Sequence, residues 1–181
     1  MEAVKTKLDG VLLVKPDIFD DNRGWFFEMY SYKKYSDLGI KARFIQDNRS
    51  KTVRKGTIRG LHFQKKDMAQ SKLITCTKGT IKDVVVDIRK NSKSYKRWIA
   101  VTLSEDNKYQ LFIPKGFAHG FLTLTDDVEI LYKVDEYYSA EHDRSICFSD
   151  PGIGVRWDTE DPVLSDKDKN APLLQDSDAD F

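Results

Sequence analysis

Short runs of β-forming residues, separated by turn residues, fill most of this chain and constrain its fold more than any other feature. Gly, Asp, Asn, Lys or Ser supplies the breaks between the runs. So many strands with so little helix indicate an all-β sandwich or barrel. The expected strands are Val11–Val14, Gly24–Tyr30, Arg43–Gln46, Thr57–Gln64, Ser71–Thr77, Thr80–Ile88, Trp98–Leu103, Gln110–Ile113, Ala118–Leu124, Val128–Tyr137 and Ser145–Phe148.

Helical signals are few. A short helix is expected over Ser31–Leu38, because Gly39 follows it as a stop signal. The stretch Asp161–Lys169 could form turns. The class is therefore all-β with a few short helices.

The length of the chain favours a single domain. Its 181 residues can bury a real core without disulfides or a structural metal. We expect one domain over 1–181, with its core at about 8–157. The acidic segment 158–181 is expected to pack on the outside of the barrel and to fray after about Leu174.

Charge and composition exclude several classes of partner. The 30 basic and 29 acidic residues give a net charge of +1, so no global field favours nucleic acid or a membrane surface. No apolar run approaches the roughly 18 residues of a membrane span, and the residues Met1–Lys5 lack the apolar region of a signal peptide, so a protein that is not exported is expected. Cys76 and Cys147 lie in hydrophobic runs, which indicates small buried side chains in a reducing compartment, with the cytoplasm as the default.

The segment Thr57–Gln64 contains one of only three histidines in the chain. Strict alternation would point Arg59 and His62 to opposite faces of the strand. A β-bulge at Gly60, which tolerates one, could aim both side chains into one cavity. A catalytic base and an ordinary core histidine beside an exterior arginine are equally compatible with this pattern.

Two further polar side chains are expected to face the interior. Lys72 shares its alternation with the apolar Ile74 and Cys76, so it is a candidate for holding a phosphate or a developing oxyanion. The alternative is a lysine that extends along a strand end to water. Tyr132 shares its alternation with Ile130 and is either core or a general acid opposite a histidine.

The turn before His119 resembles a known signature. The pattern Pro-x-Gly-x-x-His over Pro114–His119 resembles the second motif of cupins, β-barrels that often bind metal through His and Glu. The first cupin motif, His-x-His followed by Glu, is absent, so no metal site is expected. Two other clusters, Arg23–Glu28 and Gln46–Ser50, mix aromatic, amide and basic side chains that suit a base ring and phosphates.

Six stretches together resemble the dTDP-4-dehydrorhamnose 3,5-epimerase family, in order from about Leu8 to Leu174. The resemblance implies a cupin-type β-barrel (jelly roll) and a homodimer without metal or other cofactor. It also implies an isomerase that converts dTDP-4-keto-6-deoxy-D-glucose to dTDP-4-keto-L-rhamnose in dTDP-L-rhamnose biosynthesis. The stretches are Asp21–Glu28, Gln46–Ser50, Arg59–Gln64, Lys72–Leu73, Asp83–Arg89 and Pro114–Phe121.

The same resemblance assigns roles to individual residues. His62 matches the catalytic base, paired with Asp168, although Asp166 on the other side of Lys167 stays open as its partner. Tyr132 matches the general acid, and Lys72 would stabilise an enolate oxygen. Arg23 and Glu28 would reach the nucleotide from the partner subunit. The other substrate-binding positions implied are Phe26, Gln46, Asn48, Arg59, His119, Tyr138 stacking on thymine, Asp143 and Lys167.

Three alternatives remain open on the sequence. The first is an epimerase that inverts only one centre, or acts on a related dTDP-4-keto sugar. The second is a metal-dependent cupin oxygenase, which the missing His-x-His disfavours. The third is a non-catalytic sugar-binding barrel, which would leave Tyr132 and Asp168 without a chemical role.

Overall fold

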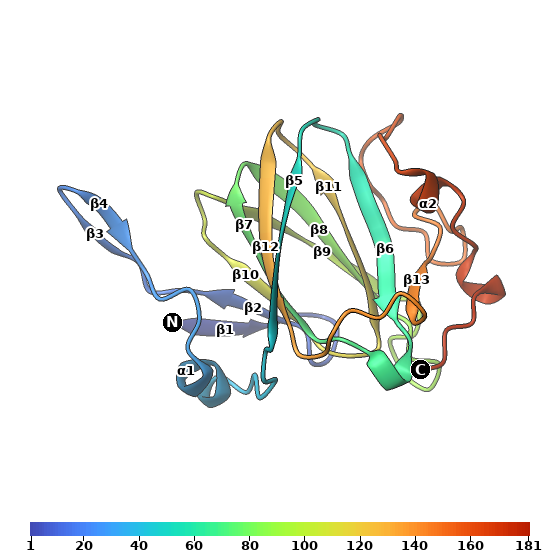
Figure 1. The fold of residues 1–181 in the computed structure, drawn as a ribbon, viewed down its shortest axis with the longest axis horizontal. Coiled ribbons are helices and arrows are strands. Elements are labelled where there is room, and N and C mark those ends of the chain that lie inside the picture. Colours follow the sequence, from blue (N-terminus) through green and yellow to red (C-terminus); the bar gives the residue numbers. More distant parts are fainter.

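Two facing antiparallel sheets form a jelly-roll barrel in the computed structural model, which describes residues 1–181 (Figure 1). The all-β prediction is therefore confirmed. The larger sheet has the strand order β1 (Glu2–Lys5), β2 (Leu12–Lys15), β10 (Gln110–Ile113), β7 (Lys72–Lys78), β12 (Val128–Val134) and β5 (Gln46–Thr52). The smaller sheet has the order β13 (Asp143–Ser145), β6 (Ile58–Gln64), β11 (Phe117–Thr123), β8 (Thr80–Asp87) and β9 (Trp98–Ser104).

The remaining elements lie outside the barrel. A hairpin of β3 (Phe19–Asp21) and β4 (Gly24–Phe26) projects away from it in Figure 1. The helices are α1 (Tyr32–Asp37) and α2 (Asp166–Lys169), with 3-10 turns at Lys66–Met68 and Leu174–Asp176. None of these helices has the length and apolar character that a membrane crossing requires.

Both sheets bury both of their faces. Val85 of β8 packs in the cluster between the sheets, whereas its neighbours Val84 and Val86 pack in a second cluster on the outer face. This arrangement explains why the apolar residues Val84–Val86 of β8 follow one another without alternation. A third cluster, in which Tyr35 and Ile40 cover the larger sheet, buries its outer face.

The C-terminal segment covers the outer face of the smaller sheet, beside β6 and β13 in Figure 1. Leu174 and Ala179 are buried there, and the Phe181 ring lies 6.2 Å from the Phe63 ring. The Lys90 amide also donates to the Phe181 carbonyl at 3.0 Å. The expected fraying after Leu174 is wrong, because apolar side chains spaced between acidic ones anchor the end of the chain.

Several predicted boundaries are also wrong. The strand expected at Arg43–Gln46 instead runs over Gln46–Thr52, where polar side chains alternate between half-buried and exposed positions at a sheet edge. A strand with so few apolar residues carries a weak sequence signal. The runs at Gly24–Tyr30 and Val128–Tyr137 end early, the last strand is Asp143–Ser145, and β1 and β3 were not predicted. Of the two free cysteines, Cys76 is buried and Cys147 only partly so.

The predicted bulge at Gly60 is confirmed. His62 pairs with His119 and Arg59 pairs with Phe121, so two residues of β6 stand opposite the single Gly120 of β11. Gly60 has a φ of +114°, in the region that favours glycine. The shift breaks the alternation, and Arg59 and His62 therefore both line the interior cavity.

We expect Gly60→Ala to destabilise the fold strongly. A Cβ at Gly60 would lie 2.6 Å from the His119 carbonyl oxygen and 2.7 Å from the Gly120 Cα. Backbone strain and overpacking together should lower the free energy of unfolding by about 3 kcal/mol, measured by urea denaturation. Gly39→Ala is the matched control, because Gly39 has a φ of +92° but no atom within 4 Å of an added Cβ. Equal losses in the two variants would contradict this account.

Candidate active site

Two adjoining cavities open into the barrel between the sheets. The deeper one has a volume of about 380 Å³ and the outer one about 230 Å³. His62, Lys72 and Tyr132 line both cavities and so mark the boundary between them. The inward orientation predicted for Lys72 and Tyr132 is therefore confirmed. The deeper cavity also contains Ser50, Thr57, Ile58, Arg59, Ile74, His119, Phe121, Ile130, Val163, Leu164, Ser165 and Asp168.

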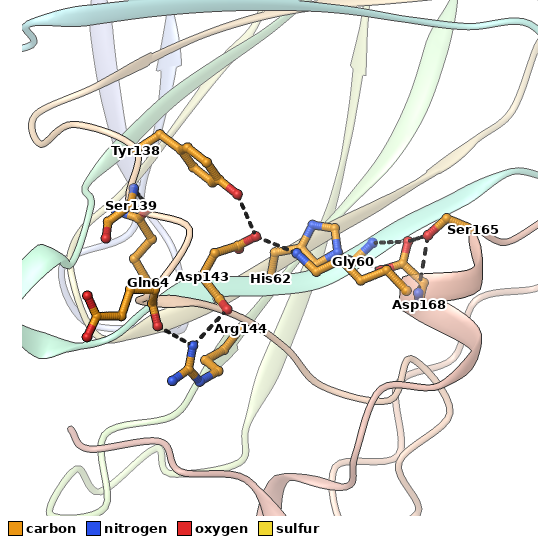
Figure 2. A network of polar contacts seen from close by, with 11 residues as sticks. Gly60, His62, Gln64, Tyr138, Ser139, Asp143, Arg144, Ser165 and Asp168 are labelled. Carbon is orange, nitrogen blue, oxygen red and sulfur yellow. Dashed lines mark hydrogen bonds and ion pairs between the residues drawn. The ribbon is translucent and has the colours of Figure 1, made fainter.

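His62 and Asp168 form a carboxylate–imidazole pair across 106 residues of sequence. The His62 Nε2 lies 2.6 Å from the Asp168 Oδ1, and Figure 2 shows the two side chains meeting below β6. Asp168 is buried, whereas Asp166 is exposed at the start of α2. The structure thus brings Asp168, and not Asp166, to the histidine.

The side of β6 that extends past the end of β13 explains why Asp168 lies there. Ile58 donates to the Val163 carbonyl at 3.0 Å, and Leu61 donates to the Ile146 carbonyl at 3.3 Å. Between them the Gly60 amide points to the Asp168 Oδ2 at 3.5 Å. A bulge leaves a backbone group without a strand partner, and here the carboxylate accepts from it.

Ser165 fixes the same carboxylate from its other side. As the N-cap of α2 it accepts from the Asp168 amide at 3.2 Å, and its hydroxyl donates to the Asp168 Oδ2 at 3.0 Å. Burial raises the pKa of Asp168, but the contacts with His62, Ser165 and Gly60 outweigh it, so the pKa lies below its usual value. Asp168 is therefore ionised at neutral pH.

His119 has a buried carboxylate partner of its own. Its Nε2 lies 2.9 Å from both Oδ1 and Oδ2 of Asp83, which is fully buried on β8. His119 is the cross-strand neighbour of His62, so the two rings lie side by side on one wall of the cavity. The third histidine, His142, contacts the Ser139 hydroxyl and lines neither cavity.

Lys72 and Tyr132 face the histidines from the larger sheet. Burial lowers the pKa of Lys72, and the negative charges of Asp143 and Asp83 act against that shift. Burial raises the pKa of Tyr132 above 10, so its hydroxyl keeps its proton at neutral pH. Lys72 forms no ion pair, which leaves its ammonium group available to an anionic ligand atom.

The outer cavity gathers five of the predicted substrate-binding residues. Lys167 donates to the Asp143 Oδ2 at 2.5 Å, and the Tyr138 hydroxyl lies 3.4 Å from the same oxygen, as Figure 2 shows for Tyr138. The amide of Gln46 donates to Asn48 at 2.9 Å on β5. The Tyr138 side chain is exposed at the rim, where a planar ring could stack on it.

The remaining predicted residues do not reach the cavities of their own chain. Arg23 and Phe26 lie on the projecting hairpin, and the exposed Arg23 side chain contacts only Asp21. Glu28 forms an ion pair with Lys34 beside α1. Within one chain, these three residues have no ligand-binding neighbours.

Several lining residues were missed from the sequence. Ser165 had a detectable signal, because a serine three residues before an acidic residue is a common helix N-cap. Asp83, which lies behind the cavity wall, also had one, since it and Asp87 are the two charged residues that share the inward parity of Val85 on β8. Phe121 and Ser50 gave no signal beyond ordinary strand residues. No group of three His, Cys, Asp or Glu side chains is arranged to hold a metal ion.

The fold and the cavity together define a jelly-roll enzyme of the acid–base type, with a histidine–aspartate pair facing a protonated tyrosine. The family model of the dTDP-4-dehydrorhamnose 3,5-epimerases matches residues 5–176. The curated epimerase of Salmonella typhimurium is 48% identical over 176 residues, which cover 96% of each chain. The chain belongs to the dTDP-4-dehydrorhamnose 3,5-epimerase family.

Solved structures agree with this assignment. The epimerase of Bacillus anthracis, with TDP and PPi bound, superposes with a TM-score of 0.93 at 47% identity, covering 95% of this chain and 98% of that one. The enzyme of Legionella pneumophila, in complex with dTDP-4-keto-L-rhamnose, has a TM-score of 0.93 at 41% identity, covering 98% and 94%. The predicted family and its cupin-type fold are confirmed.

Asp168 should make the stability of the protein depend on acid pH. Because its folded pKa is depressed, its contribution is present above its unfolded pKa of about 4 and is lost as pH falls through the folded value. Urea denaturation between about pH 5 and pH 2 should show a shallower loss of stability for Asp168→Asn than for the native protein. The exposed Asp166→Asn is the control and should follow the native curve. An unchanged slope in Asp168→Asn would contradict the assigned contacts.

Proposed function

We propose that this chain inverts C-3 and C-5 of dTDP-4-keto-6-deoxy-D-glucose, giving dTDP-4-keto-L-rhamnose for dTDP-L-rhamnose biosynthesis. One observation carries the proposal: His62 and Tyr132 come from opposite sheets and line the same cavity. A base and an acid on opposite walls suit a reaction that removes a proton from one face of a carbon and returns one to the other. Family membership supplies the identity of the sugar nucleotide.

His62 acts as the base in the proposed reaction. The hydrogens at C-3 and C-5 are both α to the C-4 ketone, so removing either one gives an enolate with its charge on the C-4 oxygen. Asp168 binds Nε2 of the ring, which leaves Nδ1 for the proton. General-base assistance of this kind is worth about 100- to 10,000-fold.

Lys72 acts at both centres, and Tyr132 completes the inversion at C-5 at least. The ammonium of Lys72 stabilises the enolate oxygen in a cavity walled by apolar Ile74 and Ile130. Tyr132 then donates its phenolic proton to the carbon from the opposite face. The phenolate regains a proton, and His62 loses one, by exchange with solvent before the next turnover.

The outer cavity is the proposed nucleotide subsite. Lys72 and Lys167 line it and Arg59 lines the adjoining cavity, so the three supply positive charge for the diphosphate. Tyr138, at the rim, would stack on the thymine ring, while Gln46 and Asn48 supply amide contacts. The ion pair of Lys167 with Asp143 must then rearrange or be shared when the nucleotide binds.

The proposed unit is a homodimer. The projecting hairpin exposes Phe19, Trp25 and Phe26 to solvent, with 58–64% of each residue accessible. Apolar side chains on an isolated hairpin favour burial against another subunit. In such a dimer Arg23, Phe26 and Glu28 would reach the partner's nucleotide subsite. The two free cysteines fit a reducing compartment, which we take to be the cytoplasm.

Substrate incubated in D2O with the protein should acquire deuterium at both C-3 and C-5, followed by NMR. His62→Ala should abolish the exchange at both centres, because no base remains at that wall. Tyr132→Phe should keep part of the exchange but lose inversion at C-5. Normal exchange in the His62 variant would refute the assignment of the base.

The same experiment tests the second candidate function, an epimerase that inverts one centre only. In the proposed binding mode both α-carbons of one ring would lie between His62 and Tyr132, so the geometry favours neither centre. Deuterium at C-3 alone would establish a single-centre enzyme. Deuterium at neither carbon would indicate a non-catalytic sugar-binding barrel.

Mixed dimers should show whether the hairpin serves the partner's site. We expect Arg23→Ala and His62→Ala each to reduce turnover when pure. Unfolded and refolded together, they form hybrids in which one of the two sites is intact, so about a quarter of the native sites should be restored. Both variants are checked for dimer mass by light scattering. No recovery in a confirmed hybrid would show that Arg23 acts within its own chain or only in folding.

A further inference from the structure

Asp83 is a buried carboxylate that the proposed reaction leaves without a role. It lies on β8 and points into the barrel on the same parity as Val85, which packs between the sheets. Its side chain is fully buried and lines neither cavity. Its two oxygens lie 2.9 Å from the His119 Nε2, and an ionised carboxylate only accepts hydrogen bonds. Nε2 of His119 must therefore carry a proton.

The opposite ring nitrogen is the one left for a ligand. The His119 Nε2 is occupied by Asp83, which lies outside the cavity. Because the ring itself lines the cavity, Nδ1 is the polar atom of the ring that remains for a ligand. Arg59 and Lys72 beside it are donors only. A keto-sugar brings hydroxyl groups that need acceptors, and a neutral His119 with its proton on Nε2 supplies one.

We propose that Asp83 is a positioning residue, which holds neutral His119 as the Nε2–H tautomer and so presents Nδ1 to the bound sugar nucleotide as a hydrogen-bond acceptor. The inference deepens the proposed function and rests on it for the identity of the ligand. It adds a second carboxylate–imidazole pair next to that of His62 and Asp168. In both pairs the Nε2 of the ring contacts an aspartate, so the two histidines share this arrangement but differ in role.

Asp83 also influences Lys72 through its charge. Its negative charge favours the charged form of Lys72, although Asp143 contributes more. This influence is only Coulombic, because Lys72 forms no hydrogen bond with Asp83. The contact with His119 is direct at 2.9 Å, so we assign the role of Asp83 to the histidine.

Imidazole ¹⁵N NMR tests the tautomer directly and needs no substrate. Only three histidines give signals, and His142 serves as an internal reference outside the cavities. At a pH where the rings are neutral, native His119 should be the Nε2–H tautomer. Asp83→Asn should shift His119 towards Nδ1–H and leave His62 unchanged, because an amide can donate where a carboxylate cannot. Asp168→Asn is the matched control and should change His62 alone.

Turnover separates the two routes. Asp83→Asn should lower kcat/KM by about 10- to 100-fold, by analogy with the loss seen when the carboxylate partner of a metal-bound histidine is removed. In a His119→Asn background the same substitution should lower kcat/KM by less than about threefold, because the effects of two residues that act as one unit are not additive. Equal losses in both backgrounds would assign the effect to Lys72 and overturn the proposal.

Three other results would also overturn the proposal: a native His119 that carries its proton on Nδ1, a His119 signal that does not respond to Asp83→Asn, or full activity in that variant. The first needs no variant, so the test survives if Asp83→Asn fails to fold. The spectra are recorded without substrate. A native protein that shows the expected tautomers but no turnover would refute the proposed function and leave the tautomer assignment intact.

Discussion

The close approach of two backbones at Gly60 and Gly120 is the constraint on which the site depends. Side chains alternate along a strand, so a regular β6 could not direct both Arg59 and His62 inward. The extra residue of the bulge shifts the alternation by one position, so the Arg59 and His62 side chains reach the same cavity. It fits only because neither strand has a Cβ at the contact, where the added atom would overlap the neighbouring backbone. One local irregularity thus decides which charges face the cavity.

The C-terminal segment joins stability to chemistry. It covers the outer face of the smaller sheet with Leu174 and Ala179, next to Trp157, and it completes the hydrogen bonds of β6 through Val163. The same segment delivers Asp168 to the Gly60 amide and to the His62 ring. Burial of the apolar side chains therefore offsets the conformational entropy that is lost when this segment and its carboxylate are ordered. The acidic composition of this segment conceals that anchoring role.

Charge in the barrel interior is balanced across the two sheets. Lys72 and Arg59 line a cavity beside three carboxylates that already have partners: Asp83 and Asp168 each pair with a histidine, and Asp143 pairs with Lys167. Arg59 donates to the Thr52 hydroxyl and the Lys51 carbonyl, whereas Lys72 is left without an ion-pair partner, at a cost that a bound diphosphate or an enolate oxygen would offset. Tyr132 stays protonated on the opposite wall because burial disfavours its phenolate.

The sequence determined the fold class, the family and the residues that face the interior of regular strands. The alternation of apolar residues indicates which face of a strand is buried, and it correctly predicted that Lys72 and Tyr132 face the inside of the barrel. It gave a weak signal for β5, whose polar side chains follow a sheet edge, and it misread the anchored C-terminus as frayed. The resemblance gave Asp168 as the partner of His62 and left Asp166 open, and the tertiary structure decided between them. Only the tertiary structure revealed that Asp83 meets His119, because that contact joins different strands. Local propensity carries no information about which distant carboxylate will fill a gap beside a bulge or beneath a ring.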